Sequence, residues 1–212
     1  MNDILTILKK IYSPVQIQAG PCKNERYLHH YFSHQLQTLP KYSITYNDAS
    51  KNVLHPEWPT SKKEEHGYGT YRHKDKKIYK VDKNGSPGFI DFAIGNYNKP
   101  EIAIEFTVSS GWKKEEVIYD MMKLMDSRNP FQKVISYNIV FRKDNLPQES
   151  AKTYANFKNA INHSLSECQK RLKNNYAHNR KYFFWVIEIG DNETRSWYCG
   201  NSDGEFKPGA PV

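Results

Sequence analysis

The chain has 212 residues, a formal net charge of +8, and aromatic residues at 14% of the sequence. So many aromatic side chains indicate a packed core and exclude an intrinsically disordered chain, while the charge favours a polyanionic partner such as nucleic acid over a merely soluble basic surface. No apolar run is long enough to span a membrane and no signal peptide is recognisable, so we expect one domain over residues 1–212, located in the cytoplasm.

The cysteines add two exclusions. Cys22, Cys168 and Cys199 lie far apart in the sequence and form no CxxC pair, so a structural zinc site is not expected. Their odd number favours a reducing compartment over a set of disulfide bonds.

Two helices are predicted at the start of the chain. Residues 1–12 carry an apolar stripe at helical spacing, and Pro14 is expected to interrupt that helix. A second helix is expected over about residues 23–38, with Glu25 in its first turn, where a carboxylate also interacts favourably with the helix dipole.

The next segment contains two candidate strands. Residues 43–46 are a possible strand, and residues 53–59 include Pro56 and Pro59 on either side of Glu57-Trp58. Prolines with this spacing forbid a helix and are typical of an edge strand or a bulged strand.

Residues 61–87 are polar and strongly basic, and lysines alternate there with tyrosines. This composition predicts a mobile insertion or a long hairpin. Basic residues mixed with aromatic residues are typical of an arm that contacts phosphates, and a plain solvated loop is the alternative. The side chains that we expect to contact nucleic acid are Arg72, Lys74, Lys76 and Lys77.

A β-hairpin is predicted within residues 88–109, where two apolar runs of period two flank a short polar loop. In the simplest register Gly95 faces Glu101 and Asp91 faces Glu105, on one face and with Cβ atoms about 5 Å apart. Opposed carboxylates destabilise a sheet unless a divalent cation or full solvation offsets the repulsion. The apolar residues expected on the opposite face are Ile90, Phe92 and Ile94, then Ile102, Ile104, Phe106 and Val108.

The rest of the chain alternates between helix and strand, which completes a mixed sheet with helices on its faces. The expected elements are a helix at about 112–127, a strand at 133–142, a helix at about 148–173, a strand at 181–189 and a last short strand around Trp197.

This order of elements, with the sequence GFID ending at Asp91 and IEFT containing Glu105, resembles the PD-(D/E)XK nuclease superfamily over roughly residues 20–190. The resemblance implies an α/β, restriction-endonuclease-like fold and hydrolysis of phosphodiester bonds in DNA, with Mg²⁺ or Mn²⁺ held by Asp91 and Glu105. Glu57 would add a third carboxylate to the metal from the neighbouring strand, and Glu25 would reach the site through water.

The sequence departs from the family pattern at Thr107, where a lysine is expected. Lys113 and Lys123 on the following helix are the candidates to replace that lysine, and surface positions for both are the alternative. A helical wheel places Lys114 inside the apolar arc, Lys113 at its edge and Lys123 on the polar side. Lys123 lies in a D-x-x-K-L pattern that resembles helices of the family. The Thr107 hydroxyl would orient a water, or the residue would only supply β propensity.

Three histidines lie on the second predicted helix. His30 and His34 have the spacing of a transition-metal pair, but no HExxH arrangement surrounds them, so surface or core positions are expected for them and for His29.

Three functions follow from these observations. The first is a metal-dependent DNA endonuclease of restriction or phage defence, acting as a homodimer by analogy with restriction enzymes of this size. The second is an inactive nuclease-fold protein that binds nucleic acid or a partner protein, and Thr107 is the feature that separates these two. The third is an RNA nuclease.

Overall fold

A computed structural model describes residues 1–17, 24–42, 53–60, 68–73, 76–82, 84–96, 99–142, 150–190, 194–200 and 205–209. The α-helices and β-strands in these residues are α1 (Asn2–Ile17), α2 (Glu25–Gln37), β1 (Val53–Pro59), β2 (Tyr68–His73), β3 (Lys76–Val81), β4 (Phe89–Asn96), β5 (Lys99–Ser109), α3 (Lys114–Met125), β6 (Lys133–Phe141), α4 (Ser150–Leu172), β7 (Lys181–Ile189), β8 (Thr194–Gly200) and β9 (Phe206–Pro208).

Seven strands form one mixed sheet in the order β1-β4-β5-β6-β7-β8-β9, and β2 pairs with β3 in a separate ribbon. Strands β5, β6 and β7 are parallel, and the other neighbours in the sheet are antiparallel. The predicted α/β class with a mixed sheet is therefore confirmed. Strand β9 is absent from the sequence-based prediction, and the strand expected at 43–46 lies outside the described residues.

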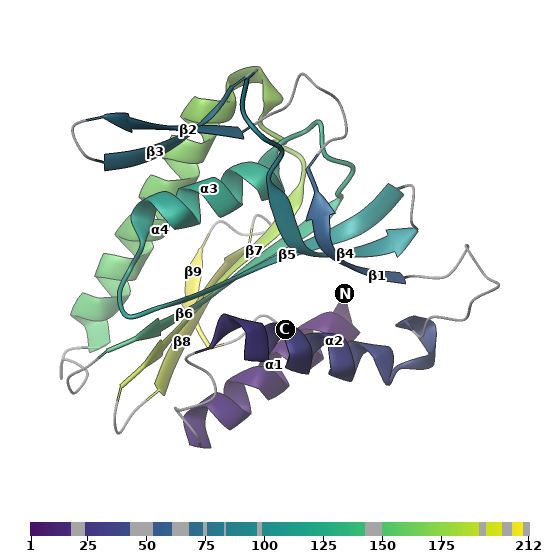
Figure 1. The fold of residues 1–212 in the computed structure, drawn as a ribbon. Coiled ribbons are helices and arrows are strands. Elements are labelled where there is room, and N and C mark those ends of the chain that lie inside the picture. The colour runs from purple at the N-terminus through teal and green to yellow at the C-terminus, as the bar shows by residue number, and fades with distance from the viewer. Residues whose placement is uncertain are drawn as a thin grey trace.

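Helices α1 and α2 cover one face of the sheet, and α3 and α4 cover the other (Figure 1). Side chains alternate along each strand, so β5 presents Ile104 and Phe106 to the first helix pair and Ala103 to the second. The predicted alternation of β5 is confirmed. The two hydrophobic layers fix the positions of α2 and α3, which carry the polar residues discussed below.

Helix α1 continues past Pro14 to Ile17, so the expected interruption at Pro14 is wrong. Proline removes one intrahelical hydrogen bond. The earlier turns bury Leu5, Leu8 and Ile11 against the sheet, and this packing holds the helix despite the lost bond.

The β4–β5 hairpin has the predicted register in its centre, where Ala93 pairs with Ala103. The register then shifts between Ile94 and Gly95, so Gly95 faces Pro100 and not Glu101 as expected. Gly95 has φ of 138°, a conformation that glycine adopts at little cost and that permits the bulge.

Strand β4 is irregular at Asp91. Ile90 packs in the cluster that contains α3, whereas Phe92 packs with α1 and α2, so these residues do not share a face as expected. Phe92–Ile104 is the last matched pair of the β4–β5 ladder, and Asp91 comes directly before it. The irregularity arises because β4 leaves β5 at this position.

The edge strand β1 is irregular at the same level of the sheet. Pro56 pairs with Phe92 and Trp58 pairs with Ile90, which places Glu57 opposite Asp91. Glu57 has φ of 51°, in the left-handed region that favours glycine. The prediction of an edge strand over residues 53–59 is confirmed.

The basic segment over residues 61–87 contains the β2–β3 hairpin, one of its two expected forms. The ring of Tyr79 stacks on Tyr119 of α3 with a centroid distance of 4.1 Å, and Arg171 of α4 donates a hydrogen bond to the Tyr79 carbonyl at 3.0 Å. Lys74 and the side chains of Arg72, Lys76 and Lys77 lie outside the described part of the chain, so their contact with phosphates stays a prediction.

Two further expectations concern membrane and redox chemistry. Among the described residues, no helix is long and apolar enough to cross a membrane. Cys168 and Cys199 are free thiols buried in the core, and Cys22 lies outside the described residues.

Candidate metal and catalytic site

Asp91 occupies the gap that opens where β4 leaves β5. Its Oδ2 atom accepts a hydrogen bond of 2.7 Å from the backbone N–H of Phe106, which takes the place of a ladder hydrogen bond between the strands. The same oxygen lies 3.4 Å from Nε2 of His29 on α2. The Asp91 carboxylate is thus oriented by the sheet on one side and by α2 on the other.

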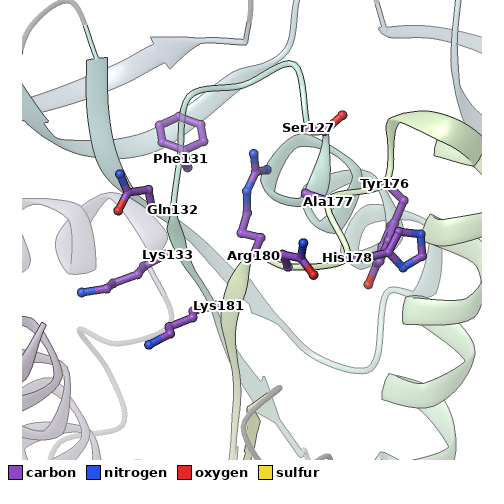
Figure 2. A pocket seen from close by; sticks show the side chains of 10 residues that line it. Ser127, Phe131, Gln132, Lys133, Tyr176, Ala177, His178, Arg180 and Lys181 are labelled. Carbon is purple, nitrogen blue, oxygen red and sulfur yellow. The ribbon is translucent and has the colours of Figure 1, made fainter.

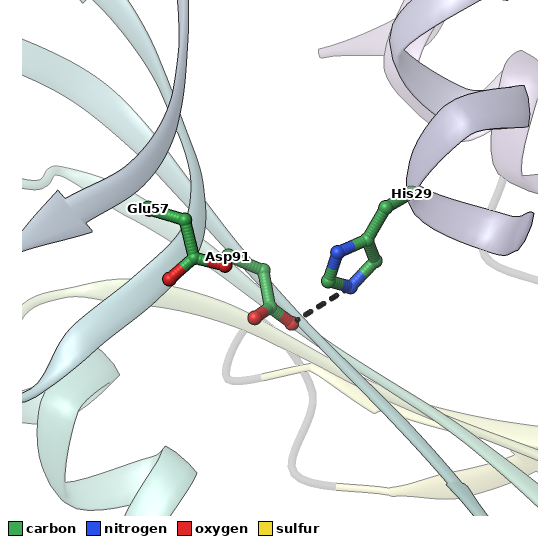
Figure 3. A group of neighbouring side chains, drawn as sticks. All are labelled: His29, Glu57 and Asp91. Atoms are coloured by element: carbon green, nitrogen blue, oxygen red, sulfur yellow. Dashed lines mark ion pairs between the residues drawn. The ribbon is translucent and has the colours of Figure 1, made fainter. Parts of the chain in front are cut away.

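Glu57 completes a cluster with these two residues (Figure 3). One ligand atom from each of His29, Glu57 and Asp91 lies within 4.8 Å of the other two. Divalent cations bind such ligands at about 2.0–2.6 Å, so one ion can span the three atoms. The three residues come from α2, β1 and β4, which the sheet and the first helix layer hold together.

The His29 side chain is half-buried and packed. Its ring lies 5.2 Å from the ring of Phe92 and 5.4 Å from that of Phe106, measured between centroids. Burial alone would lower the pKa of His29, but the neighbouring Asp91 carboxylate outweighs burial, with the charges of Glu25 and Glu57 adding to it, and the pKa is raised. The imidazole is therefore fixed in orientation and directed at a carboxylate.

A second polar cluster lies under α3, on the other face of the sheet. Lys123 Nζ is 2.6 Å from Oε1 of Glu105 and 3.0 Å from Oδ1 of Asp120. The ammonium also donates to the carbonyl oxygen of Phe89 at 2.8 Å, and Thr107 Oγ1 donates to Oδ2 of Asp120 at 3.0 Å. Glu105 is 2% exposed and Lys123 is 5% exposed, so this pair is removed from solvent.

The charges of this cluster do not balance. Burial raises the pKa of Glu105 well above its ordinary value and also raises that of Asp120, and the charge of Asp91 adds to both increases. Burial would lower the pKa of Lys123, but the charges of Asp120 and Glu105 outweigh it and raise that pKa. Two carboxylates therefore share one ammonium, with the charge of Asp91 acting on all three groups, and the excess of negative charge favours uptake of a cation.

Asp91 and Glu105 do not lie side by side on one face as the hairpin predicted. Asp91 contacts His29 on α2, whereas Glu105 contacts Lys123 on α3, which packs on the opposite face. The physical reason is the departure of β4 from β5, which turns Asp91 into the gap between the strands. The two carboxylates still interact, since the charge of Asp91 raises the pKa of Glu105.

Lys113, Lys114 and Lys123 were considered as replacements for the lysine expected at position 107. Of these, Lys123 lies beside Glu105. Lys113 is exposed and pairs with Glu116 at 3.0 Å, and Lys114 is exposed as well. The helical wheel is therefore wrong for Lys114, whereas Lys123 lies on the polar side as expected but is buried, so the surface position considered for it is wrong. The last turns of α3 are buried on all sides, because its polar side faces Glu105 and the start of β4.

Gly88, just before β4, permits the close approach of Lys123 and Tyr119 of α3 to the start of β4. A Cβ atom there would lie 2.8 Å from Tyr119 Oη and 2.9 Å from Cδ of Lys123. Any side chain at this position would displace the lysine or the tyrosine, whose ring centroid lies 4.9 Å from Nζ.

Glu25 lies at the border of the first cluster. Its Oε2 atom accepts from the backbone N–H of Val108 at 3.3 Å. Burial and the charge of Asp91 raise the pKa of Glu25, which places it within electrostatic range of the cluster. His29, which the sequence analysis did not select, follows Glu25 by four residues on α2, and that spacing is the signal that would have identified it.

A pocket of about 700 Å³ lies elsewhere, at the N-terminal ends of β6 and β7 (Figure 2). Lys133 and Lys181 begin these strands and pair in register. Arg180 lines the pocket but directs its guanidinium to carbonyl oxygens of Leu124, Asp126 and Asn129 at the end of α3. None of the residues predicted to act in catalysis or metal binding lines this pocket.

No protein-family model, curated protein or solved structure matches the chain. Its function must therefore be inferred from the two clusters at the β4–β5 junction.

Proposed function

We propose that the protein is a metal-dependent nuclease, of restriction-endonuclease-like architecture, that hydrolyses phosphodiester bonds in DNA. The observation that carries this proposal is the buried Lys123–Glu105 pair, with Nζ 2.6 Å from Oε1, within electrostatic range of Asp91 in the partly exposed His29–Glu57–Asp91 cluster. A cation site next to a fixed ammonium suits a reaction in which negative charge develops on a phosphoryl group.

The residues present fit a divalent metal ion. Asp91, Glu57 and His29 would hold it from the open side, and Glu105 would add a carboxylate from the α3 side. When bound, the ion polarises a phosphoryl oxygen and lowers the pKa of a coordinated water. Its positive charge would also offset the excess of carboxylates around Lys123.

Lys123 would stabilise the charge that develops on the phosphate, and its neighbours would keep it in place. The Thr107 hydroxyl donates to Asp120 and fixes its carboxylate, which contacts the Lys123 ammonium. The ammonium also donates to the Phe89 carbonyl. Thr107 would thus act on the reaction through Asp120 and Lys123.

The non-enzymatic alternative was considered because position 107 lacks the lysine of the family pattern. Lys123 lies beside Glu105 and offers an ammonium in its place, which weakens the argument for an inactive protein.

A direct test is to incubate purified protein with single-stranded and duplex DNA and RNA in Mg²⁺ or Mn²⁺. We expect cutting that stops when a chelator is added. If no substrate is cut with either metal, the binding-only alternative is correct, and cutting of RNA alone would identify an RNA nuclease.

We expect Mn²⁺ to activate the enzyme at lower concentration than Mg²⁺. Mg²⁺ prefers oxygen ligands in a strict octahedron, whereas first-row transition metals accept imidazole more readily. His29→Ala should reduce the advantage of Mn²⁺ by about tenfold. The measurement is the metal concentration that gives half-maximal cutting.

His30→Ala is the matched control, because His30 is the next residue on α2 and is exposed. It should leave both activation midpoints unchanged. Equal shifts for the two variants would exclude His29 as a ligand.

A further inference from the structure

One exposed aromatic side chain lies next to the proposed metal site. Among the described residues, the large hydrophobic side chains that are exposed are Tyr27 at 41% and Phe89 at 54%. Phe89 begins β4 two residues before Asp91, and Ile90 between them is fully buried toward α3. Because Ile90 faces α3, the preceding side chain of Phe89 points to the opposite side of the strand, the side from which His29 of α2 contacts Asp91.

The backbone of Phe89 is held from both sides. Its carbonyl oxygen accepts from Lys123 Nζ at 2.8 Å, and the residue pairs with Pro59 of β1. The preceding carbonyl, of Gly88, accepts from the backbone N–H of Thr60 at 2.8 Å and from its hydroxyl at 2.9 Å. The ring is therefore displayed to solvent from a rigid strand, with little conformational entropy to lose on binding.

We infer that Phe89 is a stacking platform for an unpaired nucleobase, and that the substrate is single-stranded or locally unpaired nucleic acid at the point of cleavage. This inference rests on the proposed nuclease function, because it assumes a phosphate at Asp91. The base attached to that phosphate or to the next one lies within reach of a ring on the same face. Inside a duplex the neighbouring base pairs cover both faces of each base, so a base within a strand must be unpaired before it can stack on Phe89.

Base–aromatic stacking contributes about 1–3 kcal/mol per base and depends little on sequence. Phe89→Ala should therefore weaken binding of a single-stranded oligonucleotide by about 5- to 150-fold. Phe89→Trp should keep the affinity, whereas Phe89→Leu, which keeps apolar area without a π-face, should lose most of it. Binding to a blunt duplex of the same sequence should not change.

The experiment uses DNA and RNA oligonucleotides that contain 2-aminopurine, titrated in the presence of a chelator so that no cutting occurs. Stacking on the ring should quench the fluorophore in the wild-type protein and in Phe89→Trp only. Tyr27→Ala is the matched control, since Tyr27 is exposed on α2 but lies two residues from both Glu25 and His29, on the opposite side of the helix. Circular dichroism checks that each variant is folded.

The two proposals fail separately. Equal affinity of the wild type, Phe89→Ala and Tyr27→Ala for single strands, or no binding by any of them, would overturn the stacking role. Loss of affinity in Phe89→Ala without cutting by the wild type would retain the stacking role and reject the nuclease. If Phe89→Leu binds as well as the wild type, the affinity comes from apolar contact and the stacking role is wrong.

Discussion

Asp91→Asn is expected to abolish metal-dependent cutting of nucleic acid and to leave the fold intact. An asparagine keeps an oxygen that can accept from the Phe106 N–H, so the contact that orients the residue is retained. The negative charge that faces His29 and the metal is lost. Removal of one group that stabilises a transition state typically costs a hundredfold or more in rate, and loss of a metal ligand should cost at least that.

Glu105→Gln should have an effect of the same size, and so should the harsher substitutions Asp91→Ala and Glu105→Ala. Asp82→Asn is the matched control, because Asp82 is a carboxylate that pairs with Lys80 after β3 and contacts neither cluster. Single-turnover cutting rates with Mn²⁺ and thermal unfolding of each variant are the measurements. Activity that survives in Asp91→Asn and in Glu105→Gln would place the reaction at another site or in a contaminant.

Lys123→Met is expected to lower the cutting rate by about a hundredfold or more, whereas Lys113→Met should leave the rate unchanged. The two lysines lie on or beside the same helix, and both were candidates in the sequence. Only Lys123 is buried against Glu105, and Lys113 is exposed and pairs with Glu116. Cutting rates for the two variants at saturating Mn²⁺ make the comparison.

The same substitution should also destabilise the protein. Breaking a buried ion pair by removal of one partner costs about 3–5 kcal/mol, which lowers Tm by on the order of 10 °C for a chain of this size. Burial already raises the pKa values of Glu105 and Asp120, and loss of the ammonium raises them further. A carboxyl group with a raised folded-state pKa stabilises the protein below its ordinary pKa, and that stability is lost as the pH rises through the raised value.

The Tm difference between Lys123→Met and the wild type should therefore be larger at pH 8 than at pH 5. Adding Glu105→Gln to Lys123→Met should recover part of the stability but none of the activity, which separates the structural role of the lysine from its role in the reaction. If Lys123→Met cut as fast as Lys113→Met, Lys123 would have no role in the reaction. If the Tm difference between Lys123→Met and the wild type shrank with rising pH, the buried carboxyl groups would not be its cause.

The sequence predicted the site only where local patterns decide the structure. Period-two alternation was sufficient for the Ala93–Ala103 register, because one wrong step would move a whole apolar face into solvent. It missed the bulge at Gly95, which the glycine backbone permits, and the departure of β4 from β5 at Asp91, where β1 and α2 contribute Glu57 and His29. Alternation alone therefore placed Asp91 and Glu105 on one face.

The surface position considered for Lys123 is wrong for a related reason. A helical wheel describes how one helix separates apolar from polar residues, but it does not contain the groups that pack against the polar side. In this protein the polar side of α3 faces a buried carboxylate and a backbone carbonyl, so the lysine on that side is buried. His29 was missed because its partner, Asp91, follows it by 62 positions (91 − 29) and lies on a different element.

The left-handed backbone of Glu57 has a consequence for the engineering of this protein. A non-glycine residue in that region costs roughly 1–2 kcal/mol, and glycine or asparagine would release much of this strain. Screening of a random library for heat resistance alone would thus enrich substitutions at position 57 that also remove a proposed ligand of the metal. Thermostable variants obtained in this way should be inactive more often than chance predicts, so a screen for heat resistance needs a parallel selection for activity.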